Sequence, residues 1–564
     1  MKSFDMPDRV QKYNPKSLTI AFLVSLMLPV VVLACTEKNP VWVTLTGILL
    51  PLGSYMIFSL LSRRSGRMVW VGFIFVFFSV FQIVLSYLFG NSVVAADMFL
   101  NLLTTNPGEA TELLSNIYPA VIAVFVIYLP ILWRAWVHLR HKVMIPSRWR
   151  RRMILSGVGI FVLGCITLFL GCRNDVRRVL RDEVFPINVC YNLGLSISEA
   201  HKTSNFSVTS QDFTYQAHRN IVEPKREVYV LVLGEAARAA SWQLYGYDRP
   251  TNPLLSKRKD ISLFRGVTTQ SNTTHKSVPM MLSSVHTTQH NDIFRRKGIP
   301  HLFNEAGFTT YFISNQSPQG AMIDNLAHDA NHVIYLDEPR YDMRLLDKMR
   351  EAISTDPSSK ILFILHTYGS HFSYHQRYPR EFARFLPDDD VAISRKNLRM
   401  IRNAYDNTIL YTDYFLNEVI CELEKHPDLC SAMFYCSDHG EDLFDNGNGR
   451  FLHASPTITY HQAHVSALAW FSKAYEASFG EKVAASFANI DAPATTYSVF
   501  HTIADIASIS SPYLDVKASL VNASFDYDAP RLYLNDHNEA VVLDKEIGID
   551  DSEKELFDRA GVRL

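Results

Sequence analysis

The sequence predicts an N-terminal domain of five transmembrane helices followed by an exported α/β domain. Three observations predict this fold class. Long apolar runs are bunched before Cys172, Lys and Arg gather in loops on one side of these runs, and the remainder alternates short β-rich runs with helical stretches. A chain of 564 residues is long enough for more than one folded unit. We therefore expect a transmembrane domain at 1–172, a juxtamembrane connector at 173–224 and an exported domain at 225–564.

Five apolar runs are long enough to cross a bilayer, which needs roughly 20 mostly apolar residues per helix. They cover residues 17–35, 41–61, 68–90, 117–137 and 153–171. Buried helices of a soluble protein are the alternative, but five successive runs of this length argue against it. The first run has no convincing small-residue cleavage site, so we expect it to be retained rather than removed as a signal peptide.

The orientation follows from the loop charges, because Lys and Arg stay on the cytoplasmic side of a membrane. Positive residues occur in the tail at 2–16, in the turn at 63–67 and in the loop at 134–152. The loop at 91–116 holds three acidic residues and neither Lys nor Arg, which places it on the opposite side. Five spans then put everything after Gly171 outside the cytoplasm.

The exported part begins with a polar connector at 173–224, which we expect to be irregular, with short amphipathic pieces such as 176–185 lying against the membrane surface. Beyond it, short apolar runs separated by helical stretches indicate an α/β domain with a mainly parallel sheet. The expected strands are 228–233, 309–313, 361–365, 433–436 and 465–471, with a terminal hairpin of 532–534 and 540–543.

Charge and cysteine content exclude some classes of function. The net charge is −1 and no long basic tract occurs outside the cytoplasmic loop, which argues against nucleic-acid binding. The seven cysteines do not form a disulfide framework, and Cys421 with Cys430 is the pair that merits a test in an oxidising compartment.

Polar residues gather directly after three of the expected strands, where open α/β sheets place their sites. Glu235 follows the first strand, His366 to His371 follow the third, and Asp438 with His439 follow the fourth. An Asp-His pair alone can be a helix cap beside a surface histidine. Glu235 alone can be explained by its favourable interaction with the positive N-terminal end of a helix dipole. Together, however, carboxylates and imidazoles at several strand ends predict a site for a divalent metal such as zinc.

These residues belong to motifs that resemble the phosphoethanolamine transferases of Gram-negative bacteria, in the alkaline phosphatase and sulfatase superfamily. The resemblance covers nearly the whole chain. Its motifs are Val-Leu-Gly-Glu-Ala-Ala-Arg at 232–238, Tyr-Gly-Tyr-Asp-Arg-Pro-Thr at 245–251, Thr-His-Lys-Ser-Val-Pro-Met at 274–280, His-Thr-Tyr-Gly-Ser-His at 366–371 with Arg-Tyr-Pro at 377–379, Ser-Asp-His-Gly-Glu at 437–441 and Phe-Leu-His at 451–453.

The resemblance implies an alkaline phosphatase-like fold for the exported domain and a role for each motif. Thr274, a few residues before Ser-Val-Pro, would be the nucleophile, and a tight zinc would be held by Glu235, Thr274, Asp438 and His439. His371 and His453 would face the phosphoryl group or hold a second, weaker zinc. A threonine hydroxyl is inert near neutral pH, so metal coordination is needed to stabilise its alkoxide. Without the other motifs, Thr274 would be read as an ordinary capping hydroxyl.

The membrane part offers a second match to the family. Asn101, Thr105 and Glu109 recur at intervals of four, which would put them on one helical face. The family uses a matching Asn, Thr and Glu near the ethanolamine end of the lipid, and Glu109 would supply an acidic partner for the ammonium group. A solvated acidic helix face is an equally good explanation.

The implied activity is transfer of phosphoethanolamine from phosphatidylethanolamine to a lipopolysaccharide acceptor, either lipid A or core. The transfer would pass through phosphothreonine and release diacylglycerol, at the inner membrane of a Gram-negative bacterium with the catalytic domain in the periplasm. A related phosphoglycerol transferase or phosphatase, and a catalytically silent membrane-anchored sensor, are the alternatives. The chain departs from the family pattern at Ala236, Gln270, Met280, Gln319 and 372–373, and none of these positions is a proposed zinc ligand.

Overall fold

The computed structural model describes residues 13–36, 39–89, 95–99, 107–172, 175–221, 223, 225–318, 321–338, 340–445, 449–455, 457–543, 549 and 551–562, with the backbone alone at 88–89 and 107–116. The chain forms two compact units. One comprises Met1–Phe99 and Thr111–Ser196, and the other comprises Leu100–Ala110 and Ile197–Leu564. The predicted domain limits at 172 and 224 stay a prediction.

The first unit consists of long apolar helices, as the hydropathy pattern predicts. They are α2 (Pro15–Thr36), α3 (Val41–Ser59), α4 (Ser65–Val71), α5 (Phe73–Phe89), α7 (Pro107–Arg140) and α8 (Ser147–Gly171). Among the described residues, α2, α3, α8 and the segment Ile117–Arg140 of α7 are each long and apolar enough to cross a membrane. The pair α4 and α5 supplies a fifth span if the two helices are counted together.

The third predicted span is broken rather than continuous, because α4 and α5 meet at an angle of 55°. Gly72 lies at the break, with φ −83° and ψ 8°. A Cβ atom at this position would lie 2.8 Å from the ring of Phe22 in α2. Glycine therefore lets α2 pack closely against the bend, a tertiary contact that the hydropathy of 68–90 does not reveal.

The connector is largely helical, so the expectation of an irregular segment is wrong, although a helix does lie within the expected piece at 176–185. It contains α9 (Val176–Asp182), α10 (Ile187–Ser204) and α11 (Phe206–Thr209). Three of the buried positions of α10 are polar and four residues apart, namely Asn188, Asn192 and Ser196. Ser196 donates a hydrogen bond of 2.8 Å to the Ala96 carbonyl. Because polar side chains occupy this buried face, the apolar periodicity that indicates a helix is missing from the sequence.

The second unit is built on a seven-stranded sheet with the order β2-β9-β6-β1-β5-β3-β4. The strands are β1 (Glu227–Gly234), β2 (Ile261–Leu263), β3 (Thr309–Ser314), β4 (His332–Tyr335), β5 (Lys360–His366), β6 (Cys430–Ser437) and β9 (Ala467–Phe471). β6, β1, β5, β3 and β4 are parallel to one another, whereas β9 runs antiparallel to both of its neighbours, β6 and β2. All five predicted strands and the mainly parallel sheet are confirmed.

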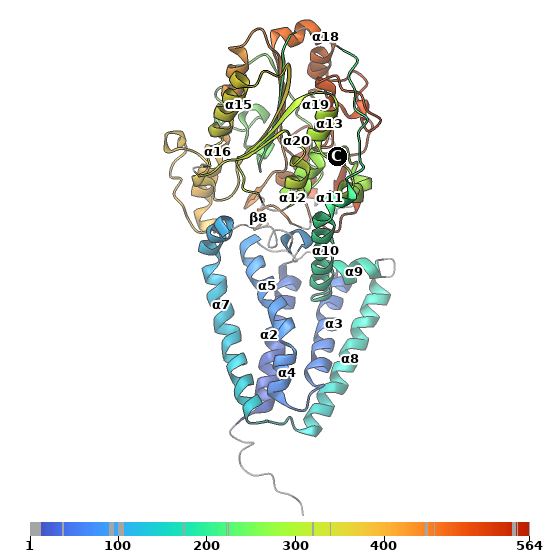
Figure 1. The fold of residues 1–564 in the computed structure, drawn as a ribbon. Coiled ribbons are helices and arrows are strands. Elements are labelled where there is room, and N and C mark those ends of the chain that lie inside the picture. Colours follow the sequence, from blue (N-terminus) through green and yellow to red (C-terminus); the bar gives the residue numbers. More distant parts are fainter. Residues whose placement is uncertain are drawn as a thin grey trace, which may run out of the picture. The chain divides into compact units, whose positions relative to one another are not determined.

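Helices cover both faces of this sheet, and Figure 1 shows α15 and α16 on the side opposite to α13 and α19. The helices are α12 (Thr274–Met281), α13 (Ile299–Glu305), α14 (Met322–Ala327), α15 (Met343–Thr355), α16 (Leu398–Glu424), α17 (Tyr460–Ala463), α18 (Lys473–Ala488), α19 (Ser498–Ile506) and α20 (Asp551–Arg559). The predicted terminal hairpin is present as β10 (Leu532–Leu534) and β11 (Ala540–Val542). A short pair, β7 (Asp442–Leu443) and β8 (Phe451–Leu452), was not predicted.

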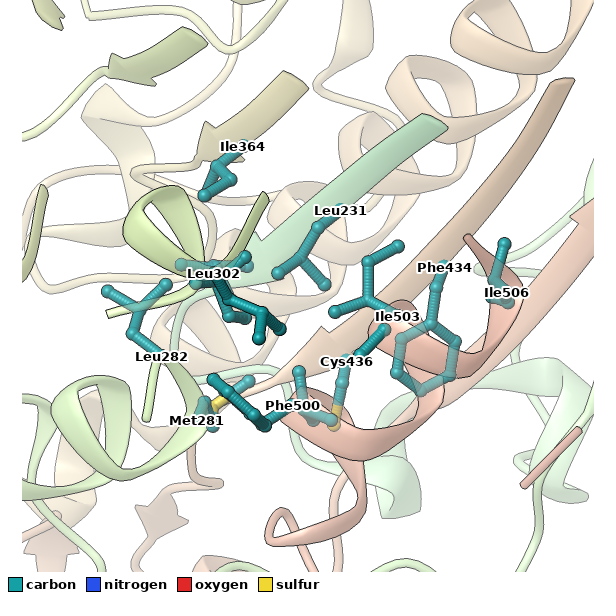
Figure 2. Close-up of a cluster of buried hydrophobic side chains, with 14 of the residues drawn as sticks. Leu231, Met281, Leu282, Leu302, Ile364, Phe434, Cys436, Phe500, Ile503 and Ile506 are labelled. Carbon is teal, nitrogen blue, oxygen red and sulfur yellow. The ribbon is translucent and has the colours of Figure 1, made fainter. Parts of the chain in front are cut away.

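The core of this unit fixes the helix that carries the predicted nucleophile. Figure 2 shows Leu231 and Phe434 of the central strands gathered with side chains from α12, α13 and α19. Met281, at the end of α12, is fully buried in this cluster. Burial of such a side chain contributes about 1.5–3 kcal/mol, so the core anchors α12 at the end opposite to Thr274. Cys421 and Cys430 are free thiols in this unit.

Candidate active site

Three of the predicted site residues meet at the carboxyl-terminal edge of the sheet. β1 lies between β5 and β6, with Gly234 paired to Ser437 at the strand ends. Parallel strands end at the same edge, so Glu235 after β1 comes close to Asp438 and His439 after β6. All three side chains are buried, and they can offer ligand atoms that lie within 4.8 Å of one another.

Thr274 completes this cluster from the first position of α12. Its Oγ1 lies 3.0 Å from His439 Nε2 and 3.2 Å from the nearer carboxylate oxygen of Glu235. His439 Nε2 is also 3.4 Å from Asp438 Oδ2 and 3.6 Å from Glu235 Oε1. The structure thus brings together all four residues predicted to surround a zinc ion.

The donor set fits a divalent cation. His439 Nδ1 lies 2.9 Å from the Gly440 carbonyl, which can only accept, so the proton sits on Nδ1 and Nε2 presents a lone pair to the cluster. Asp438 Oδ1 accepts from the backbone N–H groups of Ala236 and His439, while the buried Oδ2 has no hydrogen-bond partner. Burial and the nearby Asp438 raise the pKa of Glu235 well above its ordinary value. A cation would remove this cost of placing carboxylates together.

His453 borders the cluster, with its ring centroid 4.2 Å from that of His439. Its Nδ1 is 3.0 Å from Glu441 Oε1, and the other oxygen of Glu441 accepts a hydrogen bond from the Tyr374 hydroxyl. Burial lowers the pKa of His453 to about 4 and raises the pKa of Glu441 to about 8. The histidine is therefore neutral near pH 7, and its tautomer depends on whether Glu441 accepts or donates in their shared hydrogen bond.

His371 is held through its own loop. Its Nδ1 donates a 2.6 Å hydrogen bond to the Phe372 carbonyl, and Arg377 Nε donates to the His371 carbonyl at 3.0 Å. Burial, together with the charge of Arg377, lowers the pKa of His371 to about 3. His371 is thus a second neutral imidazole, with Nε2 carrying the lone pair.

A buried carboxylate outside the motifs holds the loop that leads to His371. Asp342 accepts hydrogen bonds from the backbone N–H groups of Tyr368 and Gly369 at 2.8 and 3.0 Å, and from the Asn315 side chain at 2.7 Å. Gly369 has φ +46°, and a Cβ there would lie 2.7 Å from the Glu235 carbonyl oxygen. The loop therefore packs directly on the backbone of a predicted zinc ligand.

Several polar partners of the site were not predicted from the sequence. Gln316 donates to Glu235 Oε2 at 3.0 Å and to the Thr367 carbonyl at 2.9 Å. Tyr374 donates to Glu441, and Asp342 holds the loop that leads to His371. Gln316 closely follows β3, so the rule that sites lie after strand ends would have found it. Tyr374 and Asp342 do not follow a strand directly, and no local pattern marks them.

The membrane residues predicted to meet the lipid head group are not placed by the structure. Asn101 and Thr105 lie outside the described residues, as does Gln319, and only the backbone of Glu109 is described, within α7. The arrangement of Asn101, Thr105 and Glu109 on one helical face stays a prediction.

Comparisons with known proteins find similar sequences. The family model described as Sulfatase matches residues 227–509. Kdo(2)-lipid A phosphoethanolamine 7''-transferase of Escherichia coli (strain K12) is 28% identical over 450 residues, covering 74% of this chain and 77% of the relative. Phosphoethanolamine transferase EptA of Salmonella typhimurium is 31% identical over 275 residues, covering 46% of this chain and 50% of the relative.

Solved structures share the fold. The integral membrane protein lipooligosaccharide phosphoethanolamine transferase A (EptA) from Neisseria meningitidis has a TM-score of 0.71 at 24% identity, covering 89% of this chain and 97% of that chain. The C-terminal periplasmic domain of EptC from Escherichia coli, solved in complex with Zn, has a TM-score of 0.54 at 23% identity, covering 62% and 98%. The chain therefore belongs to the sulfatase family, and it is similar in sequence to phosphoethanolamine transferases, the resemblance that its motifs indicate.

Proposed function

We propose that this protein transfers phosphoethanolamine from phosphatidylethanolamine to a lipopolysaccharide acceptor, lipid A or core, through a covalent intermediate on Thr274. The observation that carries the proposal is the position of the Thr274 hydroxyl, within 3.2 Å of Glu235 and 3.0 Å of His439 at a buried, polar strand edge. The relatives named above are phosphoethanolamine transferases, and two of them act on lipid A or lipooligosaccharide according to their names.

Glu235, Thr274, Asp438 and His439 would hold one tight zinc ion, because they provide two carboxylates, a bare imidazole nitrogen and a hydroxyl at one point. When bound, zinc supplies positive charge that favours the threonine alkoxide and the phosphoryl oxygens. The zinc complex of the EptC domain supports this choice of metal. His371 and His453 would face the phosphoryl group or hold a second, weaker zinc.

The chain's own residues account for the first half of the transfer. Thr274 Oγ attacks the phosphorus of the donor, the bond from phosphorus to the diacylglycerol oxygen breaks, and phosphothreonine forms. Thr274 begins α12, whose first backbone N–H groups favour a phosphoryl anion. The proton that Thr274 loses is the one that diacylglycerol gains, and a neutral imidazole such as His371 or His453 can carry it.

In the second half, an acceptor oxygen attacks the same phosphorus and the bond to Thr274 Oγ breaks. A neutral imidazole at His371 or His453 accepts the proton of the incoming hydroxyl and returns it to the threonine. We place this chemistry in the periplasm, with the apolar helices in the inner membrane and Asn101, Thr105 and Glu109 around the ethanolamine end of the donor.

The covalent intermediate is tested by mass spectrometry of the full chain after incubation with phosphatidylethanolamine. We expect a phosphoethanolamine adduct on a peptide containing Thr274, its loss in Thr274→Ala, and its retention in Thr273→Ala. The control replaces the neighbouring threonine, whose side chain makes no helix-capping hydrogen bond. Adduct formation or full transfer activity in Thr274→Ala would refute the mechanism.

Donor choice and acceptor choice need separate experiments. Donors labelled in ethanolamine or in glycerol phosphate distinguish this activity from phosphoglycerol transfer, since only the first label should reach the protein. Zinc analysis of the purified chain distinguishes an enzyme from a silent sensor. Mass spectra of lipid A and core from cells with and without the gene then show which acceptor gains the phosphoethanolamine increment.

A further inference from the structure

A cavity lies in the same unit as the candidate active site and uses none of its residues. It has a volume of about 350 Å³ and is formed by the end of α10, by α11 and by the 3₁₀ segment Thr287–Phe294 with the residue that follows it. Its lining includes His201, Lys202, Thr209, Asn291, Phe294 and Arg295. Ligand pockets typically have volumes of about 300–1,000 Å³, so this cavity is large enough for a small ligand or a head group.

The charges around the cavity favour an anion. Arg295 is exposed and forms no ion pair among the residues that the structure describes. Asp292, the carboxylate in the lining, is already paired with Arg296 at 2.6 Å. Lys202 at the rim supplies an ammonium donor, while its charge is paired with Glu199 at 3.1 Å. Arg295 thus leaves the cavity with an uncompensated positive charge.

Lys202 is fixed in place rather than free in solvent. Its Nζ donates to Glu199 at 3.1 Å and to Asn291 Oδ1 at 2.9 Å, and it lies 5.1 Å from the centroid of the Phe294 ring. Because Asn291 Oδ1 accepts from Lys202, the amide NH₂ of Asn291 is turned to act as a donor. An arginine, a lysine and an amide donor are the groups that recognise phosphate oxygens.

The cavity also has an apolar component, because its exposed walls are mainly carbon. Phe294 and the stem of Lys202 provide a surface for a sugar ring or a glycerol backbone. Behind Lys202, Glu199 is shared with the buried His290, 3.8 Å away. Both side chains are buried, so the carboxylate that holds Lys202 is itself fixed in place.

We propose that this cavity binds a phosphate ester carried by a sugar or a lipid head group, and that it docks the phosphorylated part of the acceptor. The second clause rests on the proposed function, whereas binding of the phosphate ester does not.

The test measures binding of glucosamine 1-phosphate to the full chain in detergent by calorimetry. The chain carries Thr274→Ala, so that binding is scored without turnover. We expect saturable binding of glucosamine 1-phosphate and no binding of glucosamine. In Arg295→Gln the affinity should fall about tenfold, because one charge-assisted hydrogen bond is lost. Lys202→Gln should weaken binding similarly. Arg399→Gln is the matched control, because Arg399 is also exposed and has no ion-pair partner among the described residues.

A second arm identifies the source of the phosphate. Mixed micelles containing phosphatidylglycerol replace the sugar phosphate, with micelles containing diacylglycerol as the phosphate-free reference. Binding of either phosphate that depends on Arg295 supports the site and shows whether it takes a sugar or a lipid ester. Absence of binding in both arms, or an equal loss in Arg295→Gln and Arg399→Gln, overturns the proposal.

Transfer assays connect the cavity to the acceptor. In a chain with Thr274 intact, Arg295→Gln should raise the KM for a phosphorylated acceptor about tenfold and leave kcat unchanged. An unchanged KM alongside weakened glucosamine 1-phosphate binding would refute the docking role. If no transfer activity is found in any variant, the proposed function fails while the binding result stands on its own.

Discussion

Substitution of Gly440 by alanine should disable metal binding without altering any predicted ligand. Gly440 lies between His439 and Glu441, and its N–H donates to the Gln462 carbonyl at 2.8 Å. A Cβ at this position would lie 2.0 Å from the His461 carbonyl oxygen and 3.0 Å from Arg238 Cβ. Carbon and oxygen atoms approach to about 3.3 Å at closest, so the backbone must move by about 1.3 Å.

That displacement is large compared with the tolerance of a metal site, where distances hold to about 0.2 Å. We expect zinc affinity to fall about 100-fold or more, because His439 moves with its neighbour. Overpacking should also lower the free energy of unfolding by about 1–3 kcal/mol. Chelator competition measures the affinity, and thermal unfolding with and without zinc measures the stability.

Gly480→Ala is the matched control, since a Cβ at Gly480 in α18 meets no atom within 4 Å. It should keep normal zinc affinity and be as stable as the parent, or more stable by up to about 1 kcal/mol. If Gly440→Ala binds zinc and unfolds like Gly480→Ala, the close approach does not position His439, and the reasoning is wrong.

Three further predictions concern metal removal, pH and the loop of His371. Chelation should lower the unfolding temperature, because zinc at 100 times its Kd stabilises a fold by about 2.7 kcal/mol. In Asp438→Asn the unfolding temperature should not depend on zinc. A zinc response in this variant would contradict the site. Asp445 and Arg238 form a buried ion pair at 2.7 Å that holds the pKa of Asp445 below its ordinary value. Because its pKa is lower in the folded than in the unfolded protein, ionised Asp445 stabilises the fold above its unfolded pKa of about 4. This stabilisation is lost as the pH falls from there toward the folded pKa, so the free energy of unfolding of the parent should show this acid loss between pH 7 and pH 3. Asp445→Asn should lower the free energy of unfolding by about 3–5 kcal/mol at neutral pH, and its stability should fall less between pH 7 and pH 3 than that of the parent. If the variant has the stability and pH dependence of the parent, the ion pair does not contribute as argued. Asp342→Asn should leave the Gly369 N–H without its acceptor and lower the free energy of unfolding by about 1–3 kcal/mol. Hydrogen exchange at the Gly369 amide should become faster. Unchanged exchange would show that Asp342 does not hold the loop.

Local sequence patterns predicted the features that depend on neighbouring residues. Apolar runs predicted the membrane helices, and β-rich runs predicted β1, β3, β5, β6 and β9. Because parallel strands end at one edge, the order of the motifs also placed Glu235 beside Asp438 and His439.

The break at Gly72 and the helical connector escaped prediction for the opposite reason. The position of Gly72 requires glycine because Phe22 of another helix packs against it. The helix α10 buries polar side chains that local composition would place in solvent.

By itself, the sequence determined the long apolar helices, five strands of the sheet and the polar residues that meet at the strand ends. Hydropathy and periodicity are properties of short segments, and they are written in consecutive residues. The tertiary structure decided which buried groups complete the site, such as Gln316 on Glu235 and Tyr374 on Glu441. These contacts join side chains dozens of positions apart, because each buried polar atom takes whichever partner the packed fold brings within reach.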